Sequence, residues 1–330
     1  MIIDVHGHYT KVPPELDAYR GRQILQLARG GVKGNPGISD DQLKATLQVH
    51  LDAMALRGVD QSVFSPRAAF MGHEFGSETI SRNWTEVNND LIARAAAMYP
   101  EQFVPACQLP QSPGVSPANA LGELERCVGM GFVGCNINPD VSGGVAPLTP
   151  SLGDRWWYPL WEKMCELDVP GLIHAGSTLN PHLHMNGAHY VNTDVAAVVE
   201  LTTSRVLTDF PDLKLVIPHG GGGVPFHWNR MRSLAAGRSG TPFEESVRRL
   251  YFDLAVYDDE AMNLTIRRMG PDNVLFATEM LGTAQAIDPL TGRPFDDTLA
   301  LVSELDWLSA EDKHKIFEGN ARRLYRRADF

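Results

Sequence analysis

The stretch that decides the fold is "IIDVHGHY", residues 2–9, in which a run of strand-forming residues ends on His6 and His8. Side chains two residues apart lie on the same face of an extended strand, so both imidazoles can point at one object. A metal ion suits that geometry. The same spacing recurs at His182 and His184. That second pair lies in a Pro- and Asn-rich stretch, and we expect it to pack in a loop or at the surface.

Outward from this strand, short β-rich runs alternate with longer amphipathic stretches. The expected strands are residues 2–6, 61–65, 103–108, 132–137, 170–174, 213–217, 250–254 and 273–277. The expected helices are residues 41–57, 80–98, 116–129, 154–167, 194–209, 224–236, 258–269 and a C-terminal helical region near 297–326. Eight strands in strict alternation predict an α/β fold, a (β/α)8 TIM barrel that forms one domain over residues 1–330. An open doubly wound sheet is the alternative, because a strand count does not establish closure.

Three longer irregular stretches interrupt the alternation, at residues 10–40, 138–153 and 175–193. Each follows an expected strand, which is where a TIM barrel carries its active-site loops. We therefore predict loop insertions at the C-terminal face of the strands.

Composition and charge restrict the class of protein. The chain has 330 residues, of which 43% are hydrophobic, and a formal net charge of −11. This charge disfavours binding to nucleic acid or to an anionic membrane, whereas a small anionic substrate can still bind at a local positive site. We expect a cytoplasmic protein, because the N-terminal run lacks the features of a signal peptide and no segment is apolar enough to span a bilayer. Assembly into a homo-oligomer is compatible with the sequence but is not specified by it.

Cysteine usage agrees with a reducing compartment. The four cysteines lie in apolar stretches without CxxC spacing, at Cys107, Cys127, Cys135 and Cys165. We expect reduced, buried thiols, with neither a disulfide framework nor a zinc ribbon.

Two further strands end on histidine. "VPGLIH" places His174 at the end of the fifth expected strand, and "LKLVIPHGGGG" places His219 at the end of the sixth. Any one of these histidines is most simply explained as a core residue. In a closed barrel, however, they would meet His6 and His8 at one mouth. This joint placement predicts a metal site.

The eighth strand adds an acid, because Glu279 follows the apolar run in "NVLFATEM". A carboxylate buried there needs a cation, hydrogen bonds or protonation. Three neutral imidazoles and one carboxylate suit Zn²⁺, although iron or manganese accepts the same ligands. The fourth strand ends in "GCNINPD", with Asn136 and Asn138 where a two-metal site needs a bridging lysine. We therefore predict one zinc ion per chain.

Arg67, in "FSPRAAF" after the second expected strand, is a candidate for binding a substrate carboxylate in a bidentate fork. An ordinary surface ion pair is an equally good explanation for it. The signals of other chemistries are absent from the sequence, since it contains no GxSxG elbow, no GxxxxGK[ST] loop and no complete GxGxxG.

The set "DVHGHY", "LIHAG", "VIPHGGG", "LFATEM" and "IFEGNARRLY" resembles the metal-dependent amidohydrolase superfamily, in the branch of decarboxylases and hydratases of aromatic degradation. The resemblance covers the whole chain. It implies that His6, His8, His174 and Glu279 ligate zinc and that His219 is a nearby acid or base. Related decarboxylases carry aspartate where this chain has Glu279, and this departure agrees with the hydratase pattern.

The resemblance implies reversible addition of water to the C=C bond of 4-oxalomesaconate, giving 4-carboxy-4-hydroxy-2-oxoadipate in protocatechuate or gallate degradation. Glu279 and His219 would move the protons, in roles that the sequence leaves open. Arg67, Asn180 and Tyr190 are candidates for orienting the substrate carboxylates, with loop packing as the alternative for each. Two other functions stay open. They are non-oxidative decarboxylation of an aromatic or muconate-like acid, and metal-stabilised binding without turnover.

Overall fold

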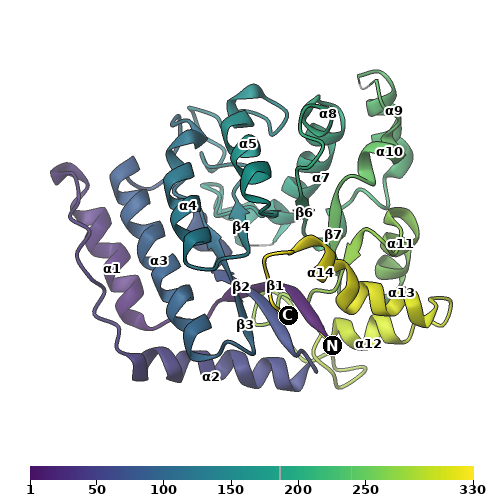
Figure 1. Ribbon diagram of the computed structural model, residues 1–330, viewed down its shortest axis with the longest axis horizontal. Helices are drawn as coiled ribbons and strands as arrows, with labels where there is room; N and C mark the ends of the chain where they lie inside the picture. The colour runs from purple at the N-terminus through teal and green to yellow at the C-terminus, as the bar shows by residue number, and fades with distance from the viewer. Residues whose placement is uncertain (186, 239) are drawn as a thin grey trace.

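In the computed structural model, which describes residues 1–185, 187–238 and 240–330, eight parallel strands form one sheet whose order follows the chain (Figure 1). The strands are β1 (Ile3–Tyr9), β2 (Gln61–Pro66), β3 (Phe103–Gln108), β4 (Gly134–Ile137), β5 (Gly171–Ile173), β6 (Leu215–Ile217), β7 (Tyr251–Asp253) and β8 (Val274–Leu275). Every neighbouring pair is parallel. All eight expected strands are confirmed, although β4 to β8 are shorter than expected.

The first and last strands of the sheet meet. The backbone N–H of Val5 on β1 donates to the carbonyl oxygen of Phe276, just beyond β8, at 3.1 Å. Beside this bond, the Asp4 carboxylate accepts from the hydroxyl of Thr278. An open doubly wound sheet does not fit, because its strand order reverses at a switch point instead of following the chain. The sheet is curled as in a TIM barrel.

Helices surround the sheet and connect its strands (Figure 1). The α-helices are α1 (Pro14–Leu25), α2 (Asp40–Leu56), α3 (Glu78–Met98), α4 (Leu121–Gly129), α5 (Tyr158–Leu167), α6 (Pro181–Met185), α7 (Ala188–Thr202), α8 (Val206–Asp209), α9 (Trp228–Ala236), α10 (Phe243–Val247), α11 (Asp259–Met269), α12 (Thr298–Ser303), α13 (Ala310–His314) and α14 (Asn320–Leu324). Short 3-10 turns are η1 (Leu27–Arg29), η2 (Ala68–Met71), η3 (Pro117–Ala120), η4 (Arg155–Trp157) and η5 (His219–Gly221), and η6 (Lys315–Gly319) is a π-helical turn. Polar caps fix where helices begin: Ser39 and Gln42 form a capping box at α2.

The structure contains three helices that the sequence pattern does not predict. α1 and α6 lie within residues 10–40 and 175–193, both predicted as irregular, and α10 follows α9. α1 begins on Pro14, and a proline at the first helical position is compatible with a helix because its missing N–H has no partner there. The helix expected from residue 224 begins only at Trp228. Residues 222–227 form turns instead, after glycines with positive φ angles at 220–222.

Two apolar cores hold the fold together. The larger lies between the sheet and the helices, and its bulkiest buried members are Trp84, Trp157 and Trp161. The smaller is formed by the barrel plug, which we define as Ala321, Leu324 and Tyr325. The plug packs against Ile3, Val5, Val63, Val104, Ala106, Val133, Leu172, Val216, Ala255, Leu275 and Ala277. It lies at the N-terminal ends of the strands, because Tyr325 contacts the first residue of β4. The opposite end of the barrel is thus left for a pocket.

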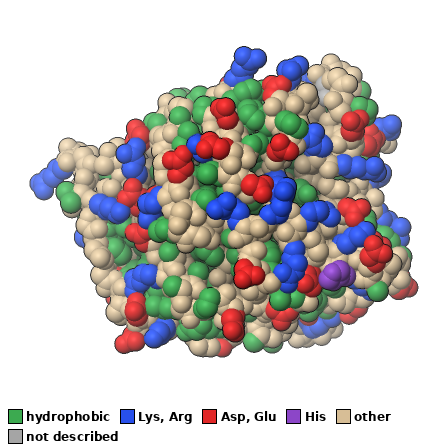
Figure 2. Space-filling model, viewed as in Figure 1, with side chains coloured by type: hydrophobic (Ala, Val, Ile, Leu, Met, Phe, Trp, Pro, Cys, Tyr) green, Lys and Arg blue, Asp and Glu red, His purple; other side chains and the backbone are tan. Residues whose placement is uncertain are grey.

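The surface and the thiols agree with the composition. On the face shown in Figure 2, acidic and basic side chains are interspersed instead of forming fields of one sign. None of the four cysteines forms a disulfide in the structure; Cys107, Cys127 and Cys135 are buried, as predicted, whereas Cys165 is partly exposed. Across the described ranges, no helix combines the length and the apolar character needed to cross a bilayer.

Candidate active site

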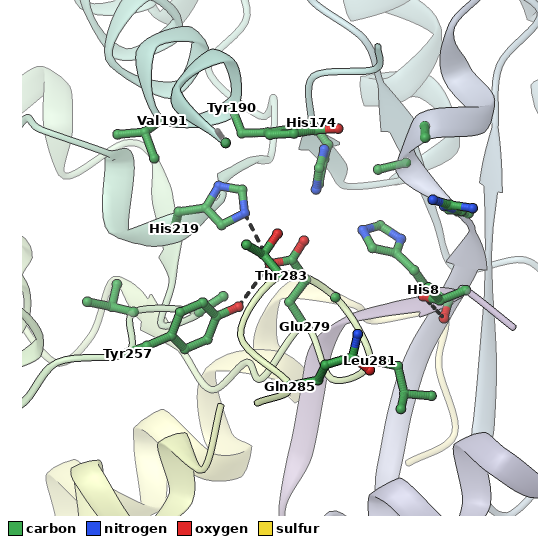
Figure 3. Close-up of a pocket in the computed structure, with 18 of the residues that line it drawn as sticks. His8, His174, Tyr190, Val191, His219, Tyr257, Glu279, Leu281, Thr283 and Gln285 are labelled. Atoms are coloured by element: carbon green, nitrogen blue, oxygen red, sulfur yellow. Dashed lines mark hydrogen bonds and ion pairs between the residues drawn. The ribbon is translucent and has the colours of Figure 1, made fainter. Parts of the chain in front are cut away.

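A cavity of about 1000 Å³ lies at the C-terminal ends of the strands. Its walls come from the segments that follow β1, β2, β5, β6, β7 and β8. His8, His174, His219 and Glu279 point into it from these segments (Figure 3). The structure therefore brings together the strand-end side chains that the sequence singles out.

β1 supplies two of the histidines, His6 and His8, and both are buried. The residue between them has to be glycine, because a Cβ on Gly7 would lie 2.0 Å from the hydroxyl oxygen of Ser62 on β2. The pairing of β1 with β2 also shifts register between Asp4 and Gly7. This irregularity sets the direction in which the two imidazoles leave the strand.

The Nδ1 atoms of both histidines are bonded to fixed acceptors. His6 Nδ1 lies 2.7 Å from Asp253 Oδ2, and His8 Nδ1 lies 2.8 Å from Ser65 Oγ. The Ser65 hydroxyl donates to a backbone carbonyl of β1 at 3.0 Å, and its oxygen also accepts from Asn136 Nδ2. Ser65 must therefore accept from His8. Each histidine carries its proton on Nδ1, which leaves a lone pair on Nε2.

His174, directly after β5, repeats this arrangement. Its Nδ1 donates to the carbonyl oxygen of Ala175 at 2.9 Å, and its Nε2 is buried without a hydrogen-bond partner among the described residues. The centroids of the His6, His8 and His174 rings lie 4.8 to 5.0 Å apart. His6 Nε2 and His8 Nε2 are 3.0 Å apart. Burial by itself would lower the pKa of His6, but Asp253 raises it above the ordinary value, so a proton can lie between the two nitrogens until a cation replaces it. Lone pairs that converge in this way favour a bound cation.

Glu279 and His219 form the other side of the pocket. Glu279 Oε2 accepts from the hydroxyl of Tyr257 at 2.9 Å and lies 3.5 Å from His219 Nε2. The Nδ1 of His219 lies 2.9 Å from Asp194 Oδ2 on α7, which orients the ring. Both His219 and Glu279 adopt positive φ angles, 51° and 49°. Such a conformation is rare for residues other than glycine and is found mainly at functional sites.

Burial and neighbouring charges separate the protonation states of these groups. Burial lowers the pKa of His174 to about 3 and that of His8 well below its ordinary value, and the charges of the other histidines act in the same direction. Burial by itself would raise the pKa of Glu279, but His219 holds it well below the ordinary value. Burial likewise opposes the charged form of His219, but Asp194 and Glu279 raise its pKa well above 6.5. The pocket thus combines neutral imidazoles with a carboxylate beside a charged imidazolium.

His6, His174, His219 and Glu279 each offer one ligand atom, and these atoms all lie within 4.8 Å of one another. This geometric group shares three members with the predicted ligands, but it contains His219 in place of His8. The Nε2 of His8 is nevertheless in contact with that of His6. The side chains that face the centre of the pocket therefore outnumber the four positions of a tetrahedral ion, which leaves one of them for proton transfer.

The three predicted substrate-binding residues differ in location. Arg67 and Tyr190 line the cavity. Within the described part of the chain, Arg67 forms no ion pair, and its guanidinium lies 5.8 Å from the Phe70 ring centroid. Asn180 is exposed, and its Oδ1 accepts from the backbone N–H of His182 at the start of α6. The structure therefore does not bring Asn180 into the cavity.

Of the second HxH pair, the structure describes the side chain of His182 alone. His182 is an exposed residue of α6, as expected for a loop or surface position. The side chain of His184 falls outside the described residues.

Sequence reasoning misses three residues that hold the site, Asp194, Asp253 and Tyr257, and one cation that lines it, Lys11. Asp253 does carry a signal, because it is the only charged residue of the seventh expected strand, residues 250–254, and lies one position before its end. Asp194 lies within a helix and Tyr257 within a loop. Nothing in their sequence surroundings distinguishes them from ordinary surface residues.

Comparisons with known proteins agree with this site. A family model described as amidohydrolase matches residues 3–327. The 2-keto-4-carboxy-3-hexenedioate hydratase of Sphingobium sp. is 42% identical over 100% of this chain and 97% of its own length. The crystal structure of 4-oxalomesaconate hydratase from Rhodopseudomonas palustris superposes with a TM-score of 0.90 at 43% identity, covering 99% of this chain and 96% of that one. A gamma-resorcylate decarboxylase of Polaromonas sp. is 28% identical over 72% of this chain and 74% of its own. This chain belongs to the amidohydrolase family.

Proposed function

We propose that this chain is a hydro-lyase that adds water to the C=C bond of 4-oxalomesaconate, giving 4-carboxy-4-hydroxy-2-oxoadipate in protocatechuate or gallate degradation. The observation that carries the proposal is the convergence of the Nε2 atoms of His6, His8 and His174 beside Glu279. The identity of 42% to a hydratase along the full chain supports the same reaction.

One zinc ion is the proposed cofactor, with His6, His8, His174 and Glu279 as its ligands. Three imidazole nitrogens and one carboxylate oxygen match the donor set that zinc prefers, and manganese or iron is the alternative ion. When bound, the ion supplies Lewis acidity, which lowers the pKa of water and polarises substrate oxygens. β4 ends near Asn136, whose amide is bonded to β2, and this supports a single ion per chain.

Glu279 and His219 divide the proton transfers. The water oxygen bonds to C4 of the substrate while its proton passes to Glu279. The double-bond electrons then form a C–H bond at C3, next to the keto group, with a proton from His219. Tyr257 and Asp194 hold the two residues in place through the contacts at 2.9 Å. The raised pKa of His219 and the lowered pKa of Glu279 suit a proton donor and a proton acceptor.

Arg67 and Tyr190 orient the substrate carboxylates, together with Lys11, from the cavity wall. A tricarboxylate carries charge that the net charge of −11 would repel, so cations inside the cavity are needed to attract it. Asn180 is outside the proposed contacts, since its side chain caps α6. The proposed loop insertions are residues 10–40, 138–153 and 175–193, of which the first and the third contribute residues to the cavity wall.

The test uses purified protein with 4-oxalomesaconate and, separately, with aromatic acids such as dihydroxybenzoates. Absorbance of the conjugated alkene, the mass of the product and released CO₂ are followed together. We expect loss of alkene absorbance and a gain of one water, both abolished by a chelator and restored by zinc. Release of CO₂ without water addition would replace the hydratase by a decarboxylase. A chelator-sensitive melting temperature without turnover of any of these acids would favour a binding protein.

A further inference from the structure

β7 ends on a carboxylate that is not among the cavity-lining residues yet contacts two histidines of the candidate metal cluster, His6 and His219. Asp253 is fully buried. Its Oδ2 lies 2.7 Å from His6 Nδ1. Its Oδ1 accepts from the backbone N–H of His219 at 2.9 Å and from that of Ala255 at 3.1 Å. Each carboxylate oxygen therefore has its own partners, His6 on one side and the backbone N–H groups on the other.

The Oδ2 contact determines which nitrogen of His6 faces the pocket. An acceptor at Nδ1 keeps the proton on that atom, and the Nε2 lone pair then points toward His8 and His174. The side chains of Asp253 and His6 are both 0% exposed, so water does not compete for the contact. A donor in place of Oδ2 would reverse the tautomer of His6.

The Oδ1 contact acts on the backbone of His219. This residue has a φ of 51°, and the three glycines after it also have positive φ angles. A left-handed residue other than glycine needs surrounding contacts to hold it there. The ring of His219 is held separately, by Asp194. Asp253 therefore holds the backbone of His219 in position, and Asp194 orients its ring.

A buried carboxylate can also serve stability alone, and the chain contains one for comparison. Asp296 is fully buried and accepts from Arg57 Nε at 2.8 Å. The hydrogen bonds to its carboxylate come from Arg57, at the end of α2, and no pocket residue contacts it in the described hydrogen bonds. Asp253 differs because its partners include His6 on β1 and the backbone of His219 after β6, both members of the candidate metal cluster.

We propose that Asp253 is a positioning residue that sets the tautomer of His6 and the backbone position of His219 with one carboxylate. Metal affinity and the placement of the proton donor then depend on the same side chain. This inference rests on the metal site of the proposed function.

Asp253→Asn tests the inference, because an amide has one acceptor oxygen and can accept a hydrogen bond either from His6 Nδ1 or from the backbone N–H of His219, but not from both. If its oxygen faces the backbone N–H of His219, its NH₂ faces His6 Nδ1 and drives the proton to Nε2; the flipped amide opposes the N–H of His219 instead. The zinc dissociation constant of full-length protein is measured by chelator competition. Hydrogen–deuterium exchange of the peptide containing residues 218–224 is measured in parallel. We expect zinc affinity to fall about 10- to 100-fold and exchange of that peptide to accelerate.

Two control variants show whether the effects of Asp253→Asn come from its contacts with His6 and His219. Asp296→Asn replaces a buried carboxylate away from the pocket, and it should lower stability without changing zinc affinity. Asp194→Asn loosens only the ring of His219, so it should lower kcat while zinc affinity stays within about twofold of the original, since Asp194 contacts none of the proposed ligands.

The possible results separate this inference from the proposed function. Wild-type protein that binds no zinc would overturn the metal site and this inference with it. Wild-type protein that binds zinc, beside an Asp253→Asn variant with unchanged affinity and exchange, would overturn the inference alone. If the variant does not fold, the wild-type amides of His219 and Ala255 are compared with and without zinc. Slower exchange with zinc supports the shared carboxylate, and equal rates overturn it.

Discussion

The two ends of the barrel are built from the same strands but are held by different forces. At the plug end, Leu324 and Tyr325 pack against apolar side chains, and such contacts depend little on direction. At the pocket end, His6, His8 and His174 are each oriented by one hydrogen bond at Nδ1. Apolar packing tolerates small displacements, whereas a ring held by one bond takes its direction from one partner.

Backbone strain follows the same division. In the part of the chain that the structure describes, the residues other than glycine with positive φ are Asp168, His219, Glu279 and Leu281. All of these except Asp168 line the cavity. The comparison teaches that apolar packing stabilises the plug end, whereas the pocket end keeps costly conformations because neighbouring contacts hold them.

The largest effect is expected from a substitution at the pocket end, which should change turnover but not stability. Glu279→Gln keeps the shape of the side chain but cannot accept a proton, so turnover of 4-oxalomesaconate should fall by about 10²- to 10⁴-fold. Zinc content and melting temperature are measured on the same samples, with Glu304→Gln at the surface as the matched control. Full activity in the zinc-loaded Glu279→Gln protein would remove this residue from the mechanism.

The next largest effect is expected from a substitution at the plug end, which should change stability but not turnover. Tyr325 is 3% exposed, and Tyr325→Ala should lower the free energy of unfolding by about 3 kcal/mol through the cavity it leaves. The kcat of the folded variant should stay near that of the original protein. Urea unfolding provides the measurement, and Tyr325→Phe shows the share due to the hydroxyl. A stable variant with reduced kcat would contradict the division between the two ends.

A smaller effect concerns the rim of the pocket. Arg67→Met removes a charge-assisted contact worth about 1.5 to 3 kcal/mol, so KM should rise about 10- to 100-fold with kcat less affected. Arg82→Met, which breaks an exposed ion pair with Glu78 on α3, is the control and should leave KM unchanged. An unchanged KM in Arg67→Met would place the substrate carboxylates elsewhere in the cavity.

The effect that is smallest at neutral pH concerns acid stability. Burial, with help from Arg20, lowers the pKa of His73 to about 3, while in the unfolded chain it is about 6.5. Between these values the unfolded chain binds more protons, so the free energy of unfolding falls as pH decreases from 6.5 toward 3. The slope due to His73 is at most about 1.4 kcal/mol per pH unit. His73→Asn should flatten urea-unfolding data in this range, and an unchanged slope would contradict the assignment.

Much of the fold could be predicted from the sequence, because parallel strands buried on both faces read as short apolar runs. Their C-terminal ends share one edge, so His174, His219 and Glu279 could be placed together before any coordinates. The bounds of α1 and α7 were harder to predict, since prolines and glycines near a helix start resemble those of a loop. The single-domain organisation, the cytoplasmic location and the homo-oligomer stay predictions.

The partners of the site residues could not be predicted in the same way. Asp194 acts through a ring 25 positions away, and Asp253 through one 247 positions away. Such pairings depend on three-dimensional closure, which local patterns do not encode. Asn180 is a different case, because Asn followed by Pro is a recognisable helix start. That signal would have indicated a cap instead of a substrate contact.

The meeting of β1 with β8 has a consequence for biogenesis. Asp4 and Thr278 are 274 positions apart, and each lies beside a proposed ligand, His6 and Glu279. A nascent chain emerging from the ribosome therefore lacks a complete coordination sphere until nearly all of it has been synthesised. The metal ion therefore binds after the barrel has assembled and does not guide the early steps of folding.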